Sequence, residues 1–151
     1  MWNRWAALAL VLALCAFTPK YAAGQSPPDP SRGRKAAGSL GQNRPNPFNP
    51  ETFIPFTVGD DVCSDGGKTH VVSAKIYNVL AQLVAIPILQ GAGNTSAAGR
   101  PLTNVPLACG QYVAYWDGKY INSGKEVASG IYTFFLYIDG VPLTRKMFSS
   151  K

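Results

Sequence analysis

The part of this chain after residue 42 is divided into short apolar segments, and this division constrains the fold more than any other feature of the sequence. Segments rich in Val, Ile, Phe and Tyr are separated by clusters of Gly, Pro, Asn and Asp. The chain of 151 residues contains 15 Gly and 12 Pro, so residues that end regular structure recur along it. No helical periodicity of useful length follows the first 24 residues. The pattern therefore predicts β-strands joined by turns.

The individual strands are predicted from the alternation of apolar and polar residues. They cover residues 52–58, 70–77, 83–89, 110–116, 130–138 and 141–148. Asp139-Gly140 between the last two predicts a hairpin. Pro55 places the first strand at a sheet edge or a bulge, and the last strand also borders the sheet, so a free edge is open to strand addition. Residues 90–107 are small and polar and predict a mobile loop. About seven short strands favour an antiparallel β-sandwich.

The first 24 residues predict a secretory signal peptide. Arg4 precedes an apolar run over residues 5–17, and the small residues Ala22, Ala23 and Gly24 follow. The apolar run has 13 residues, fewer than the roughly 20 that a membrane-spanning helix needs. The alternative is an uncleaved anchor helix. Either interpretation predicts an exported protein, in the periplasm, at the periplasmic face of a membrane or at the cell surface.

Residues 25–42 predict a flexible linker, because they contain many Pro and Gly and almost no large apolar side chains. The linker carries Arg32, Arg34 and Lys35, which contribute to the overall count of 14 Lys and Arg against 8 Asp and Glu. These cations are either solvated or contact an anionic lipid or an acidic partner. Residues 43–151 have a net charge close to zero. This argues against a nucleic-acid-binding groove in the predicted domain.

Cysteine use agrees with export. Cys15 lies in the leader, and Cys63 and Cys109 remain as a pair. A pair of cysteines in an exported chain predicts a disulfide between them. Two free thiols or a disulfide to a partner protein are the alternatives.

The chemistry-bearing residues do not form a catalytic set. His70 has no second His or matched Cys for a metal site, and the sequence contains neither a phosphate-binding loop nor a nucleophile elbow. Asp60, Asp61 and Asp65 form either a calcium loop or a solvated acidic turn. The aromatic residues between 112 and 148 form either a core or a stacking platform. We predict no enzymatic activity, no cofactor and no bound metal.

Five segments, in this order along the chain, resemble a known family. They are NRPNPFNP at 43–50 with Thr52, AKIYNVLAQLVA at 74–85, YWDG at 115–118, GKEVASGIY at 124–132 and TRKM at 144–147. The family is the Ig-like domain shared by flagellar hook-capping proteins and by C-terminal modules of secreted bacterial proteins, including type IX secretion sorting domains. The resemblance implies an Ig-like antiparallel β-sandwich over residues 43–151 that serves for attachment or sorting. The family usually has Gly at the position of Ala81.

These features predict an exported, non-enzymatic structural or accessory subunit that docks through its Ig-like domain onto a protein partner in a larger assembly. The alternatives are a secretion-sorting or cell-surface attachment module and a small carbohydrate-binding protein or hydrolase. We expect no nucleic-acid partner, and membrane contact only through the N-terminal segment. The predicted docking residues are Arg32, Arg34, Lys35, Asn46, Pro47, Phe48, Asn49, Pro50, Arg145 and Lys146, together with the 90–109 loop.

Overall fold

The described part of the chain is all-β. The computed structural model describes residues 35–59, 64, 67–91 and 97–151. Within these ranges it forms nine strands and no helix. No helix there is long and apolar enough to cross a bilayer. The leader predicted over 1–24 and most of the predicted linker lie outside the described residues.

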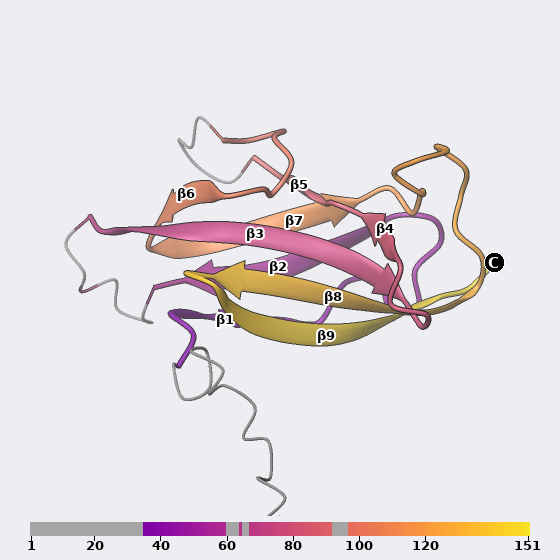
Figure 1. Cartoon of the computed structure of the whole chain (residues 1–151), viewed down its shortest axis with the longest axis horizontal. Coiled ribbons are helices and arrows are strands. Elements are labelled where there is room, and N and C mark those ends of the chain that lie inside the picture. The colour runs from indigo at the N-terminus through magenta and orange to yellow at the C-terminus, as the bar shows by residue number, and fades with distance from the viewer. Residues whose placement is uncertain (1–34, 60–63, 65–66, 92–96) are drawn as a thin grey trace, which may run out of the picture. The chain divides into compact units, whose positions relative to one another are not determined.

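The strands form two antiparallel sheets (Figure 1). The four-stranded sheet has the order β1-β2-β7-β5, with β1 at Gly38–Leu40, β2 at Thr52–Val58, β7 at Gly110–Trp116 and β5 at Ile88–Leu89. In the five-stranded sheet, β3 at Thr69–Asn78 pairs with β8 at Gly130–Ile138, which pairs with β9 at Val141–Ser149. The other edge of β3 pairs with β4 at Leu83–Ala85 and with β6 at Val105–Ala108.

The two sheets share one hydrophobic core. Side chains of a strand alternate between its faces, and the inward positions of both sheets carry large apolar residues. Examples are Ile54, Phe56 and Val58 of β2, Val72 and Ile76 of β3, Tyr112 and Trp116 of β7, and Phe134, Leu136 and Ile138 of β8. The strands predicted over 52–58, 110–116 and 130–138 have the predicted bounds.

The hairpin between β8 and β9 is confirmed at the predicted turn. Asp139 and Gly140 have φ angles of 50° and 80°, the positive values that a two-residue type I′ turn requires at both central positions. The strand pairing runs without interruption from Ile138 opposite Val141 to Gly130 opposite Ser149.

Two predictions about the N-terminal side of the domain are wrong. The linker was predicted to extend to residue 42, but residues 38–40 form β1, which pairs with β2. Leu40, the one large apolar residue of the stretch 25–42, is buried there. The strand at 52–58 is not at an edge, because β2 lies between β1 and β7. Pro55 is tolerated there because only its carbonyl is used on the β1 side, where it accepts a hydrogen bond from Gly41 N at 2.9 Å.

Two further differences concern residues 83–108. The strand predicted over 83–89 is split into β4 and β5, which belong to different sheets. Pro87 lies at the crossing, where a residue without an N–H cannot continue a ladder. The mobile loop predicted over 90–107 also contains β6 at its C-terminal end. Leu102, Val105 and Leu107 are buried there, so apolar residues fix the segment against β3.

The Pro-rich segment 43–50 packs onto the body of the domain. Phe48 is fully buried, with its ring centroid 5.1 Å from that of Trp116 and 6.3 Å from that of Tyr132. Its backbone N–H donates to the carbonyl of Phe148 at 2.8 Å. At the other end of the segment, the buried Asn43 amide donates to Thr52 Oγ1 at 2.9 Å. The segment is therefore part of the fold.

Replacing Phe48 by Ala should destabilise the domain strongly. The variant leaves a cavity beside Trp116, and a change of this kind costs about 3–5 kcal/mol of unfolding free energy. Phe53→Ala is the matched control, because the Phe53 side chain is 39% exposed. Urea denaturation of both variants measures the difference. Equal losses would contradict the assigned role of Phe48.

Replacing Ala81 by Gly should stabilise the turn between β3 and β4. Ala81 has a φ angle of 58°, in the left-handed region that disfavours residues with a Cβ. Relief of this strain outweighs the entropy that Gly adds to the unfolded chain, so we expect a gain of about 0.5–1 kcal/mol. Ala114→Gly in the extended strand β7 is the control and should destabilise. Thermal unfolding tests both, and a loss of stability in Ala81→Gly would contradict the strain argument.

Candidate interaction surface

The outward face of the five-stranded sheet is unusually apolar. An antiparallel sheet with one solvated face normally carries polar residues on that face. In β8, however, the outward positions are Ile131, Thr133, Phe135 and Tyr137. Core alternation therefore accounts for four of the seven large apolar or aromatic residues in this strand, and the other three face away from the core.

Three outward aromatic rings form a row across β3 and β8. The ring of Tyr77 meets that of Phe135 edge-on, with centroids 5.4 Å apart. The rings of Phe135 and Tyr137 are nearly parallel, with centroids 6.3 Å apart. This arrangement follows from the register, which sets Lys75 opposite Phe135 and Ser73 opposite Tyr137. All three aromatic side chains are half-buried, so part of each ring remains accessible.

Aliphatic and aromatic side chains extend this row toward one end of the sheet. Ile131 and Phe148 lie opposite each other in β8 and β9, with exposed fractions of 43% and 44%. Leu83 of β4 lies opposite Tyr77. We call the outward side chains Tyr77, Leu83, Ile131, Phe135, Tyr137 and Phe148 the aromatic face. A contiguous exposed apolar patch of this kind indicates a binding surface.

The charges around the aromatic face are positive. Lys75 lies opposite Phe135, and Lys146 lies opposite Thr133. The outward positions of β3, β8 and β9 carry no Asp or Glu. The hairpin turn between β8 and β9 carries the carboxylate of Asp139. One of its oxygens accepts a hydrogen bond from His70 Nδ1 at 2.6 Å, and the other accepts one from Val71 N at 2.9 Å.

A hollow of about 320 Å³ indents this side of the sheet beside β3. Outward residues of β3, including Ser73 and Lys75, line one part of it. The segment 102–104, Ala74, Ile86, Tyr137 of β8 and Gly140 complete the lining. Tyr137 of the aromatic face thus lines the same hollow as the Ser73 hydroxyl, the Asn104 amide and the Lys75 ammonium group.

Two other hollows have no basic side chains in their lining. One of about 400 Å³ lies on the four-stranded sheet among residues such as Ser39, Thr57 and Gln111. Another of about 200 Å³ lies beside Trp116 and Ile121. Neither is lined by Lys, Arg or His, and within the described ranges no three His, Cys, Asp or Glu side chains gather to hold a metal ion.

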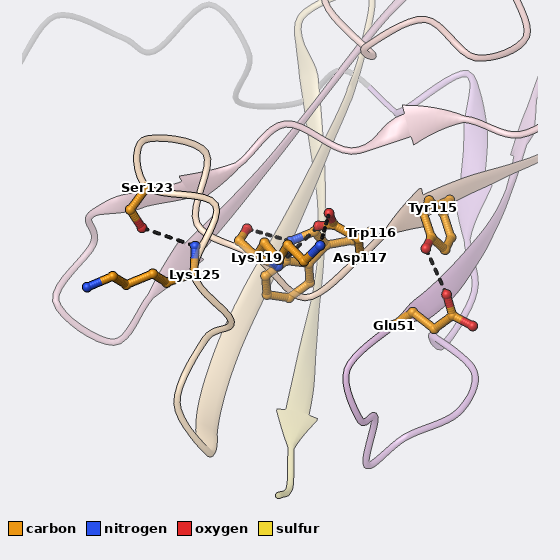
Figure 2. A network of polar contacts seen from close by, with 7 residues as sticks. All are labelled: Glu51, Tyr115, Trp116, Asp117, Lys119, Ser123 and Lys125. Atoms are coloured by element: carbon orange, nitrogen blue, oxygen red, sulfur yellow. Dashed lines mark hydrogen bonds and ion pairs between the residues drawn. The ribbon is translucent and has the colours of Figure 1, made fainter.

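The polar contacts near Trp116 serve the turn that follows β7 (Figure 2). Trp116 Nε1 donates to the Lys119 carbonyl at 3.0 Å, and Lys119 N donates to Asp117 Oδ1 at 3.1 Å. Nearby, the Tyr115 hydroxyl donates to Glu51 Oε2 at 2.7 Å, and this bond raises the pKa of Tyr115 to about 12. Because these groups already satisfy one another, the network stabilises the structure and offers few free groups to a ligand.

The predicted docking residues differ in their exposure. Asn46, Pro47, Asn49 and Pro50 are exposed, as are Lys35, Arg145 and Lys146. Phe48 is buried in the core and has no surface to offer a partner. Arg32 and Arg34 lie outside the described residues, as do Asp60, Asp61 and Asp65.

The predicted disulfide has one described member. Cys109 lies between β6 and β7, and Gly59 packs closely against it. Gly59 has a φ of 85°, and a Cβ at this position would come within 2.5 Å of the Cys109 sulfur, so both conformation and space require glycine. Cys63 lies outside the described residues, and the Cys63–Cys109 disulfide stays a prediction.

Only part of the aromatic face and of the hollow was among the predicted sites. Residues 102–104 of the hollow belong to the predicted 90–109 loop, and the aromatic residues after position 112 were assigned either to a core or to a stacking platform. One sequence signal marks the aromatic face. Residues 130–138 are apolar or aromatic at almost every position, whereas a strand with one solvated face should alternate. The hollow has no such signal, because Ser73 and Asn104 meet only through the pairing of β3 with residues 102–108.

Comparisons of the chain with family models, with curated proteins and with solved structures gave no match. The resemblance to hook-capping and sorting domains therefore stays a prediction from the sequence segments. The interpretation of the surface depends on the geometry described above.

The contact between His70 and Asp139 should make stability depend on pH in the acid range. The hydrogen bond from His70 lowers the pKa of Asp139, helped by the bond from Val71 N and by the charge of Lys68. A carboxylate with a lowered pKa stabilises the fold fully above its ordinary pKa of about 3.9 and loses this contribution as the pH falls through the lower folded value. Asp139→Asn should therefore be less stable than the wild type near pH 6, and the difference should shrink toward pH 2.

Urea midpoints measured across this pH range test the prediction. Asp117→Asn is the control, because Asp117 is also half-exposed and lies 3.8 Å from Lys119. This control should follow the wild-type curve closely. A stability difference between Asp139→Asn and the wild type that stays constant down to pH 2 would refute the assignment.

Proposed function

We propose that this chain is a non-enzymatic exported subunit that docks, through an Ig-like β-sandwich, onto a protein of a larger periplasmic, membrane or cell-surface assembly. The observation that carries the proposal is the aromatic face. Its exposed Ile131 and Phe148 continue a row of aromatic rings, and large apolar and aromatic side chains are what protein interfaces concentrate at their centres.

The dimensions of the sheet suit this role. A strand of nine residues, such as β8 or β9, spans about 30 Å, and neighbouring strands lie about 4.8 Å apart. Four adjacent strands therefore present roughly 500–600 Å². A standard interface buries about 800 Å² on each partner. The sheet face supplies most of such an area, and the turn residues Val79 and Leu80, which are 74% and 73% exposed, extend it.

The proposal moves the docking surface away from the Pro-rich segment. Phe48 fills the core, so the segment 43–50 offers no large apolar side chain to a partner, only its exposed Arg44, Asn and Pro residues. Lys146 belongs to both surfaces. It is one of the docking residues predicted from the sequence, and it also borders the aromatic face. The five sequence segments that resemble attachment modules support the same class of function.

Photo-crosslinking in the native host tests the proposal. The photoreactive residue p-benzoylphenylalanine replaces Phe135 on the aromatic face or, as the control, Gln111 on the outward face of β7. We expect an adduct with another protein from position 135 and none from position 111. Adducts from neither position, or equally from both, would contradict docking through the aromatic face.

A further inference from the structure

The hollow beside β3 has one wall that is fixed by hydrogen bonds. Ser73 Oγ donates to Asn104 Oδ1 at 2.9 Å, and Asn104 N donates to Ser73 Oγ, also at 2.9 Å. Asn104 has a φ of 51°, a left-handed conformation that Asn adopts more readily than most residues. This reciprocal pair holds the Asn104 side chain in place at the rim of the hollow.

The groups that remain unused around the hollow are hydrogen-bond donors. The oxygen of the Asn104 amide is occupied by Ser73, which leaves the amide nitrogen. Within the described part of the chain, the Lys75 ammonium and the Tyr137 hydroxyl also have no hydrogen-bond or ion-pair partner. An amide nitrogen and an ammonium group can only donate, and a hydroxyl can do so. A ligand that matches them must accept hydrogen bonds.

The local charge points to an anion. Lys75 lines the hollow, and no outward residue of β3, β8 or β9 is acidic. Asp139 adds a negative charge near Gly140, where its oxygens are bound to His70 and to Val71, four residues before Lys75 along β3. The positive charge that a ligand meets is therefore at the Lys75 side of the hollow. An ionised carboxylate has only acceptors and a negative charge, and it is the anionic group that the side chains of a protein partner carry.

We propose that the hollow receives an Asp or Glu side chain of an acidic segment of the partner protein. This inference rests on the proposed function, because the rest of that segment lies along the aromatic face. Tyr137 lines the hollow and also ends the row formed with Phe135 and Tyr77. The partner segment therefore has an aromatic or aliphatic residue close to its acidic one.

Peptide display on the full chain tests the inference. Random peptides displayed on phage are selected on the immobilised wild-type protein, and the best peptide is then measured against Lys75→Glu, Asn104→Asp and Lys125→Glu. We expect the selected peptides to combine Asp or Glu with an aromatic or aliphatic residue. Binding should weaken at least about tenfold for Lys75→Glu and Asn104→Asp.

Lys125→Glu is the matched control, since Lys125 is an exposed lysine in the loop after β7 and lies outside the hollow. Its affinity should equal that of the wild type. Asn104→Asp keeps a side chain of the same shape that tolerates positive φ, and circular dichroism confirms that each variant is folded. Selected peptides without acidic residues, or acidic peptides that bind Lys75→Glu as well as the wild type, would overturn the inference.

An acidic polysaccharide is the other source of carboxylates. Binding of polygalacturonate, a sugar polymer that carries carboxylates, is measured to distinguish it from an acidic peptide. Binding of this polymer that depends on Lys75, without selection of acidic peptides, would also overturn the peptide assignment. The two proposals fail separately. Crosslinks from position 135 together with non-acidic peptides would leave docking intact and remove only the carboxylate site, whereas loss of the crosslinks would remove the docking function itself.

Discussion

The burial of Phe48 between Trp116 and Tyr132 is the contact on which the rest of the domain depends. Trp116 ends β7 of one sheet and Tyr132 belongs to β8 of the other, so this single side chain fills the core where both sheets end. The backbone of Phe48 is also bound to the C-terminal end of the chain, because it donates to Phe148 and accepts from Ser150 N at 3.1 Å. A segment rich in proline thereby replaces a strand at the edge of the five-stranded sheet.

This edge contact decides how the domain can meet another molecule. Along β9, the Lys146 carbonyl accepts from the Gln42 side chain at 3.0 Å, and Phe148 N donates to Asn46 Oδ1 at 2.9 Å. Pro142 has no N–H to offer. Near its C-terminal end, the backbone groups of β9 that a new strand would need are therefore occupied, which is one way that proteins protect an edge from strand addition. The outward face of the sheet, by contrast, exposes side chains and not backbone groups.

The strands and turns that are determined by residues adjacent in the sequence could be predicted. The β8–β9 hairpin follows from Asp139-Gly140 between two apolar runs, and its turn geometry requires those residue types. The sequence did not predict β1, β6 or the split at Pro87, because these short strands exist only through pairing with distant partners. Half of the aromatic face was visible in residues 130–138, which are apolar or aromatic at almost every position. The Ser73–Asn104 pair was not, since its two members lie 31 positions apart.

Alternate positions of the strand β8 point into the core and toward the outward face of the sheet. Phe134 and Leu136 are fully buried and hold the sheets together, whereas Phe135 and Tyr137 between them face outward. Because strand neighbours fix the backbone of these outward rings, and edge-on packing holds Tyr77 against Phe135, few side-chain conformations are left to lose on binding. Association then costs less ordering entropy than it would on a loop. A rigid sheet face of this composition therefore needs less contact area for a given affinity than a flexible loop of the same composition would need.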